Sequence, residues 1–357
     1  MATTPTVLVT GVSRSLAARF ARAAAADTVC EVIGVDMTPP RDDLGRATFV
    51  RADIRSPAIA KVVQGRGVDT VVHMAIVATP AGESGRASAR ETAKEINVIG
   101  TMQLLAACQR AATFRKLVVQ SSVSVYGASP RDPAAFTEED SARVQPRTGF
   151  GHDAIEIESY VRGFGRRRPD VVVTTLRLAT LLGAGVDSRL ARYLSLPVVP
   201  RVLGFDARLQ LLHPDDAVRA LELVVREDLP GTFNVAAPDV VTLSQAIRRM
   251  GRPTVGVPRG SAPLVASLFR SWRAADFSAD QIDALTYGRV MDTSRFTEAG
   301  FVPCRSTAEA LAEFVATAQP GLLSAERVEG AAGAVARFAE RADRRADRHA
   351  ARRAGRA

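Results

Sequence analysis

Short apolar runs alternate with segments of helical periodicity through the first half of the chain. Runs rich in aliphatic and β-branched residues predict strands over residues 6–11, 31–36, 47–54, 68–75, 116–122 and 171–178. Helices are predicted between them, over residues 15–26, 58–64, 97–112 and 152–164. Continuous apolar strands separated by helices are typical of a parallel sheet that is covered by helices on both faces.

The order of these elements predicts an α/β fold, a doubly wound parallel sheet of the Rossmann type that spans residues 1–180. After Leu181 the prolines become more frequent and the elements shorter, which predicts a smaller C-terminal substrate-binding lobe over residues 181–320. Some of its segments, including a strand, turn and helix at 209–225, are expected to return to the Rossmann core. Residues 321–357 are rich in Ala and Arg and predict a basic helical tail.

The loop "TGVSRSLA" (10–17) joins the first strand to the first helix, where a dinucleotide diphosphate is bound in such sheets. Gly11 supplies the tight turn, and Ala17 is small enough for the helix-packing position. Arg14 or Ser15 stands where a second glycine would let the diphosphate approach the backbone. The loop is therefore a candidate cofactor site in which Gly11, Ser13 and Arg14 take part.

Asp36 ends the second strand and decides our cofactor prediction. Its carboxylate is placed to hold the ribose hydroxyls of NAD and would repel a 2′-phosphate. Arg14 favours NADP instead, because a cation attracts that phosphate. We predict NAD, since Asp36 stands where the ribose itself is expected.

Several motifs follow one another along the chain in the order of a known family. They are "ADI" (52–54), "VVHMA" (71–75), "NVIGT" (97–101), "SSVSVYG" (121–127), "LRLATLLG" (176–183), "LLHPDDAVRAL" (211–221) and "GTFNVAAPDVVTLSQ" (231–245). In this order the chain, from about residue 6 to 318, resembles the extended short-chain dehydrogenase/reductase family of NAD-dependent sugar-nucleotide epimerases and dehydratases. It is most similar to actinobacterial members labelled UDP-glucose 4-epimerase.

The resemblance implies roles for individual residues. Contacts to the cofactor are implied for Asp53 and Ile54 at the adenine, and for His73, Ala75 and Asn97. Ser122 aligns with the catalytic Ser or Thr, and substrate contacts are implied for Ser124, Thr180 and Arg208. The substrate is expected to be a small molecule, with nucleotide sugars as the candidates. The resemblance also implies a homodimer, formed through the helices before Ser122 and after Phe150.

The family's proton-transfer pair, Tyr-x-x-x-Lys, is absent from this chain. Counted back from Glu158, its two positions hold Phe150 and Ala154, and none of the four tyrosines has a lysine four residues later. Phenylalanine cannot accept a proton, and alanine cannot lower the pKa of a neighbour. Two titratable residues stand nearby, His152 and Asp153.

His152 is a second catalytic candidate beside Ser122, but an exposed or capping position near a helix start is the interpretation that we favour. On a helix its side chain points about 200° away from Phe150. Arg177 and Arg208 are candidates to pair with a diphosphate or, equally, to form surface ion pairs.

Two functions therefore stay open. One is an NAD-dependent epimerase/dehydratase-like oxidoreductase with a non-standard active site, and the other is a catalytically inactive NAD-binding regulator or scaffold.

Composition does not decide between these two functions. Hydrophobic residues make up 46% of the chain, and no apolar run is long enough for a membrane span. The three cysteines form no C-x-x-C pair, so no metal ligands are assigned. We expect a cytoplasmic protein.

The net charge of +9 is concentrated at the C-terminus. Residues 337–357 hold eight Arg against three acidic residues, a net of +5, and five of these Arg form one helical stripe. A solvated helix is the main interpretation of this tail. Contact with nucleic acid, anionic lipid or an acidic surface is the alternative, and it predicts binding that weakens steeply with salt.

Overall fold

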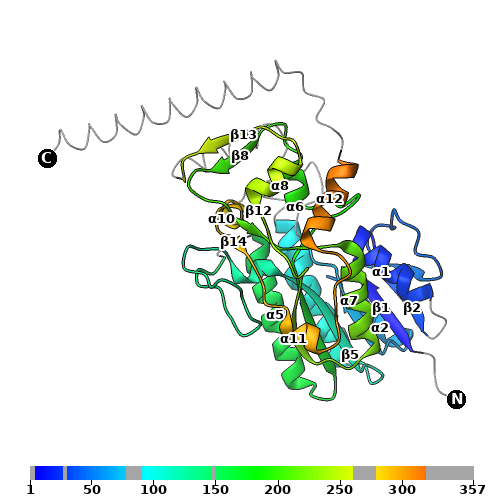
Figure 1. Cartoon of the computed structure of the whole chain (residues 1–357). Helices are drawn as coiled ribbons and strands as arrows, with labels where there is room; N and C mark the ends of the chain where they lie inside the picture. The colour runs from blue at the N-terminus through cyan, green and yellow to red at the C-terminus, as the bar shows by residue number, and fades with distance from the viewer. Residues whose placement is uncertain (1–4, 27–29, 78–90, 147–148, 260–278, 319–357) are drawn as a thin grey trace.

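A seven-stranded parallel sheet forms the centre of the molecule (Figure 1). The computed structural model describes residues 5–26, 30–77, 91–146, 149–259 and 279–318. In spatial order the strands are β11 (Gly231–Val235), β6 (Val172–Leu178), β5 (Lys116–Ser122), β4 (Thr70–His73), β1 (Thr6–Thr10), β2 (Glu31–Asp36) and β3 (Thr48–Arg51). Every neighbouring pair is parallel, which confirms the predicted Rossmann-type α/β class.

The helices around the sheet differ from the predictions mainly at their ends. Those of the first half are α1 (Ser15–Ala26), α2 (Ile59–Gly65), α4 (Thr101–Gln109) and α5 (Gly149–Arg167). A π-helical turn, η1 (Glu95–Gly100), leads into α4, so the helix predicted over 97–112 starts earlier and with a wider turn. Helix α5 is longer than the predicted 152–164 and places His152 in its first turn.

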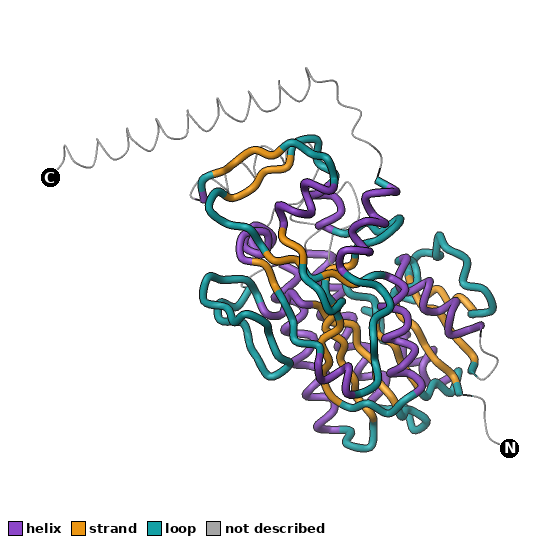
Figure 2. The backbone as a smooth tube through the Cα atoms, viewed as in Figure 1, coloured by secondary structure: helices purple, strands orange, loops and turns teal. Residues whose placement is uncertain are grey.

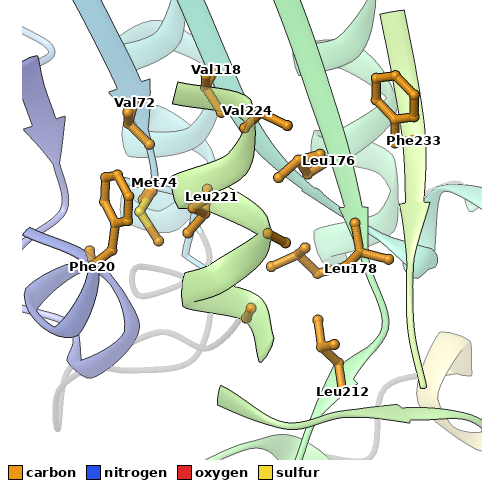
Figure 3. Close-up of a cluster of buried hydrophobic side chains, with 14 of the residues drawn as sticks. Phe20, Val72, Met74, Val118, Leu176, Leu178, Leu212, Leu221, Val224 and Phe233 are labelled. Atoms are coloured by element: carbon orange, nitrogen blue, oxygen red, sulfur yellow. The ribbon is translucent and has the colours of Figure 1, made fainter. Parts of the chain in front are cut away.

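Alternating strand residues build a separate core on each face of the sheet. Val7 and Val9 pack on one face with α1 and α7 (Pro214–Arg226), whereas Leu8 packs on the other with α2, α4 and α5. Figure 3 shows Leu221 and Val224 of α7 against this first face. Because both faces are covered, the central strands β1 and β4 are buried along their whole length, with side chains of both faces in a core.

A second lobe with its own apolar cluster sits beyond the carboxyl ends of the strands (Figure 2). Its elements are β7 (Thr180–Leu181), α6 (Arg189–Leu194), β8 (Val199–Val202), β9 (Arg208–Leu209), β10 (Leu211–Leu212), β12 (Val241–Thr242), α8 (Leu243–Arg249), β13 (Thr254–Val257), α10 (Ala279–Tyr287), β14 (Gly288–Arg289) and α12 (Thr307–Thr317). Between them the chain returns to the sheet as α7, β11 and α11 (Ser294–Glu298), whose Phe296 joins the core around β1.

The strand order reverses between β1 and β4, which is where open α/β sheets bind their ligands. The loops after β1, β2, β4 and β5 all meet at this edge, and the second lobe faces it. The predicted basic tail lies outside the described residues. Among the described helices, none combines the length and apolar character needed to cross a bilayer.

Candidate functional site

The loop after β1 depends on a glycine at position 11. Gly11 has a φ of +83°, and a Cβ atom there would lie 2.8 Å from Ala75 Cα and 2.9 Å from the Met74 carbonyl oxygen. Backbone meets backbone at this point, so no side chain fits. Ala75 therefore acts through its backbone, whose N–H donates to Thr10 Oγ1 at 3.2 Å.

Asp36 ties the end of β2 to this loop. Its Oδ2 accepts hydrogen bonds from the Ser13 amide (3.0 Å) and the Ser13 hydroxyl (2.7 Å), and its Oδ1 accepts one from the Met37 amide (2.7 Å). A carboxylate has about four acceptor positions, and the fourth accepts from the Thr38 amide at 3.5 Å, a long bond that a ribose hydroxyl could replace. Rotation of the Ser13 hydroxyl away from Oδ2 would free a second acceptor position on the carboxylate.

Arg14 places a cation in this loop. Its Nη1 donates to the Met74 carbonyl oxygen at 3.4 Å, and its side chain lines the large cavity described below. Burial lowers the pKa of the Arg14 guanidinium, while the nearby Asp36 carboxylate opposes that shift. A diphosphate could fit this loop only if the guanidinium moved from Met74 to the phosphate oxygens.

Asp53 is engaged by a neighbouring arginine. Its carboxylate accepts bonds from Arg55 Nε (3.0 Å) and Nη2 (2.9 Å), and Arg55 Nη1 reaches Glu95 at 3.0 Å. Burial alone would raise the pKa of Asp53, but the hydrogen bonds and charge of Arg55 lower it. Ile54 is buried against Gly100. An adenine contact by Asp53 would therefore be made beside Arg55.

His73 belongs to a buried hydrogen-bond chain beneath the cavity. Its Nδ1 lies 2.8 Å from Thr10 Oγ1 and its Nε2 lies 2.8 Å from Thr101 Oγ1. Thr101 donates to the Asn97 carbonyl (2.5 Å), so its oxygen must accept from His73 Nε2–H. Burial lowers the pKa of His73 to about 4, which keeps the ring neutral. His73 thus supports the site without lining it.

Asn97 is hydrogen-bonded to the backbone of Val77, a residue that lines the cavity described below. Its side-chain amide bonds both the N–H and the C=O of Val77, at 2.6 and 3.2 Å, and donates to Asp153 Oδ2 at 2.8 Å. Asp153 is fully buried and does not line the cavity. Asn97 and Asp153 therefore position the segment after β4 on α5, a link between residues far apart in sequence.

Ser122 sits at the mouth of β5 and faces the cavity. It caps the short helix η2 (Val123–Tyr126): its Oγ accepts from the Ser124 amide and donates to Ser124 Oγ, both at 3.2 Å. The preceding Ser121 donates instead to the buried Glu158, at 2.6 Å. The two adjacent serines thus have different tasks, because alternate strand residues point to opposite faces.

Arg177, a candidate for a diphosphate or a surface ion pair, makes neither contact. It is buried behind β5, where it donates to Glu158 at 3.0 and 2.7 Å and to the Tyr126 hydroxyl at 2.8 Å. Tyr126 in turn donates to Asn234 Oδ1 at 2.7 Å. Burial would lower the pKa of Arg177, but its bonds to Glu158 raise it.

A cavity of about 490 Å³ lies over this edge of the sheet. Arg14 and Met74, from the loops after β1 and β4, line it together with Ser122, Ser124, Phe150 and Thr180. Phe150 thus stands in the cavity at the position of the missing tyrosine, and the buried Ala154 replaces the lysine. Arg189 at the start of α6 places its Cζ 5.9 Å above the Phe150 ring.

His152 is not brought to this cavity. It is partly exposed on α5, with Nδ1 3.8 Å from Glu156 Oε1, and it is not among the residues that line the cavity. The helical offset from Phe150 is the reason, since two residues along a helix turn the side chain by about 200°. Ser122 and His152, paired as catalytic candidates, are therefore separated.

A second cavity, of about 120 Å³, adjoins the first and shares Ser124, Thr180 and Arg189 with it. Arg208 also lines it, although its exposed guanidinium turns to the Ala134 carbonyl at 2.5 Å. The three predicted substrate residues thus meet here. Sequence analysis missed Arg189 and Arg289 in this cavity; a lone arginine within the apolar segment "YGRVMD" was the only available signal for Arg289.

Comparison with known proteins agrees with this geometry. The model of the NAD-dependent epimerase/dehydratase family matches residues 7–236. Uncharacterized proteins of Mycobacterium bovis and Mycobacterium tuberculosis are each 48% identical over 314 residues, which make up 86% of this chain and 82% of each relative.

Among the solved structures with a similar fold are MoeE5 and a UDP-glucose 4-epimerase. MoeE5 in complex with UDP-glucuronic acid and NAD has a TM-score of 0.66 at 22% identity and covers 88% of this chain and 99% of its own. The UDP-glucose 4-epimerase of Thermotoga maritima with UDP-glucose has a TM-score of 0.66 at 18% identity, over 87% and 98% of the two chains. With most of its length matched by the family model, the chain belongs to the NAD-dependent epimerase/dehydratase family.

Proposed function

We propose that this protein is an NAD-dependent oxidoreductase of the epimerase/dehydratase kind that acts on a nucleotide sugar or a related small molecule without a Tyr–Lys pair. The cavity of about 490 Å³ carries the proposal, because it joins the loop around Arg14 to Ser122 in one space. Its size lies in the range of roughly 300–1,000 Å³ that is usual for small-molecule sites.

NAD is the proposed cofactor and, when bound, would supply the hydride acceptor. Asp36 would hold the ribose in place of its long bond to the Thr38 amide, and its charge would repel a 2′-phosphate. Arg14 would pair with the diphosphate after leaving Met74. MoeE5, with a similar fold, is described as bound to NAD, which supports the choice.

Ser122 is the residue that we assign to the reacting oxygen of the substrate. Its hydroxyl can donate a hydrogen bond to that oxygen by turning away from Ser124, which is 3.2 Å distant. Phe150 can exclude water from the reacting carbon but cannot take a proton. Since His152 lies outside the cavity, we assign proton transfer to neither residue.

The proposal is tested by calorimetric titration of the purified protein with NAD and with NADP, after any carried-over cofactor has been removed. We expect micromolar or tighter binding of NAD, weaker binding of NADP, and about a 10- to 100-fold loss of NAD affinity in Asp36→Ala. Asp43→Ala is the matched control, because Asp43 is an exposed aspartate whose hydrogen bond within the described residues goes to the nearby Gly45 amide. Absence of binding by either cofactor would overturn the proposal.

The second candidate function is an inactive NAD-binding regulator or scaffold. Phe150 and Ala154 favour it, because neither can support proton transfer where the family has its tyrosine and lysine. The double variant Phe150→Tyr with Ala154→Lys separates the two functions, measured as NADH absorbance and product formation with a panel of nucleotide sugars. Turnover by the wild type supports the enzyme; turnover by the double variant alone supports the inactive form.

Homodimerisation is proposed through the helices that flank β5. Ile99 on η1, Met102 on α4 and Tyr160 on α5 are large apolar or aromatic side chains that stay 46%, 45% and 38% exposed. Light scattering coupled to gel filtration is expected to give a dimer for the wild type. Met102→Lys should shift that equilibrium toward the monomer, whereas an unchanged mass would exclude this surface.

A further inference from the structure

The cavity of about 490 Å³ has few wall groups that can accept a proton. Among the described residues that line it, Asp187 is the one carboxylate, and it is exposed and paired with Arg192. The other charged side chains on the wall are arginines, which have no acceptor position for a proton. A hydroxyl that is oxidised next to Ser122 therefore needs an acceptor that lies behind the wall.

Ser121 connects this cavity to a buried carboxylate. It lines the cavity beside Ser122, and its Oγ donates to Glu158 Oε1 at 2.6 Å. Within the described residues no hydrogen bond is donated to the Ser121 hydroxyl oxygen, so its lone pairs can accept one from a ligand hydroxyl. Such a hydroxyl would lie two hydrogen bonds from the Glu158 carboxylate.

Helix α5 carries Glu158 on the same face as the two positions where the family has its tyrosine and lysine. Phe150, Ala154 and Glu158 follow one another at intervals of four residues, which places them along one stripe of the helix. A helical side chain leans toward the N-terminus of its helix, so Glu158 extends toward the turn that holds Ala154. Phe150 lines the cavity directly, whereas Glu158 is buried and reaches it through Ser121. This face of α5 therefore carries a titratable side chain although both usual positions do not.

The network behind β5 can hold a proton on Glu158 without leaving Arg177 unpaired. Besides Glu158, the Arg177 guanidinium donates to the Tyr126 hydroxyl at 2.8 Å and to the Glu138 carbonyl oxygen at 3.0 Å. The Tyr126 hydroxyl donates onward to Asn234 at 2.7 Å, which leaves its lone pairs for Arg177. A protonated carboxyl group also keeps acceptor positions. Arg177 thus retains acceptors in both protonation states of Glu158.

We propose that Ser121 and Glu158 are the proton-transfer pair of this protein and replace the tyrosine and lysine of the family. In the oxidising step the O–H and C–H bonds of the substrate alcohol break and a C=O bond forms. The hydroxyl proton passes to Ser121 Oγ as the Ser121 proton passes to Glu158, and the hydride passes to the nicotinamide cofactor. Reversal of the same transfers reduces the carbonyl again, so no proton has to leave the site. This deepens the proposed function, on which it rests, and Ser122 keeps its hydrogen bond to the reacting oxygen.

The test measures kcat and KM of the full-length protein with NAD and a panel of nucleotide sugars that includes UDP-glucose and UDP-glucuronic acid. NAD affinity is measured separately by calorimetry. Ser121→Ala should lower kcat by about 10²- to 10⁴-fold, the usual contribution of general acid–base catalysis, while KM and NAD affinity change less than about threefold. Ser121→Thr keeps the hydroxyl and should retain most of the kcat. Ser129→Ala is the matched control, because Ser129 is a buried serine that donates to Asp132 at 2.6 Å outside both cavities.

Glu158→Gln keeps the size of the side chain but cannot take the proton, so it should lose as much kcat as Ser121→Ala. The double variant should lose no more, because two groups on one path act as a unit. Additive losses, or wild-type kcat in Ser121→Ala, overturn the pair and leave the proposed function standing. NAD binding without turnover by the wild type overturns the pair and supports the inactive form, whereas absence of NAD binding overturns both proposals. If Glu158→Gln does not fold, the comparison of Ser121→Ala with Ser121→Thr decides.

Discussion

The two sides of strand β5 differ in how their polar side chains are used: one holds a buried hydrogen-bond network, and the other borders a cavity. Behind it, Ser121, Glu158, Arg177 and Tyr126 form a buried network in which each group has a partner at 2.6–3.0 Å. In front of it, the cavity walls carry guanidinium groups and Phe150, and Ser121 lies at the boundary because it also lines the cavity. We expect the buried network to contribute to the stability of the fold, and the residues of the cavity wall to determine ligand specificity.

The largest expected effect is on the back network. Glu158→Ala leaves the Arg177 guanidinium buried without its carboxylate, which should lower the free energy of unfolding by about 3–5 kcal/mol. Urea denaturation measures it. Glu139→Ala removes an exposed ion pair with Arg295 and should cost at most about 1 kcal/mol. Similar losses in the two variants would contradict the contrast between the two sides.

A smaller effect is expected from pH at His73, which supports the cavity from below. Its pKa of about 4 in the folded protein lies below the value of about 6.5 in the unfolded chain, so the unfolded state binds the extra proton between these values. Stability from this group is present above pH 6.5 and is lost as pH falls to about 4, by about 3 kcal/mol. The measurement is the difference in unfolding free energy between wild type and His73→Gln at pH 7 and pH 5. A pH-independent difference would show that His73 is not the titrating group.

The smallest effect concerns Arg14, at the front. Arg14→Gln should weaken NAD binding about tenfold and flatten its salt dependence, because one cation no longer meets the diphosphate. Arg14→Lys keeps the charge and should retain most of the affinity. Tighter binding in Arg14→Gln would mean instead that the side chain obstructs the loop.

The contrast also shows where sequence patterns were informative. The strands, the loop at Gly11, the position of Asp36 and the serines after β5 follow from local patterns, because each depends on neighbours a few residues away. The predicted placement of Arg177 was wrong, because its partner Glu158 lies on another element, at a contact that no local pattern reports. His152 lies partly exposed near the start of α5, the position that its angle on the helix already indicated from the sequence.

The sequence by itself determined the fold class, the ligand-binding edge and the absence of a Tyr–Lys pair, since periodicity and residue identity suffice for all three. Only the tertiary structure decided which charged groups meet. Arg189, Asp280 and Arg289 come from α6, α10 and β14 and converge on Ser124 of η2 because the second lobe folds back over the sheet. Electrostatic complementarity depends on distances across the fold, and these exist only once the two cores have packed together.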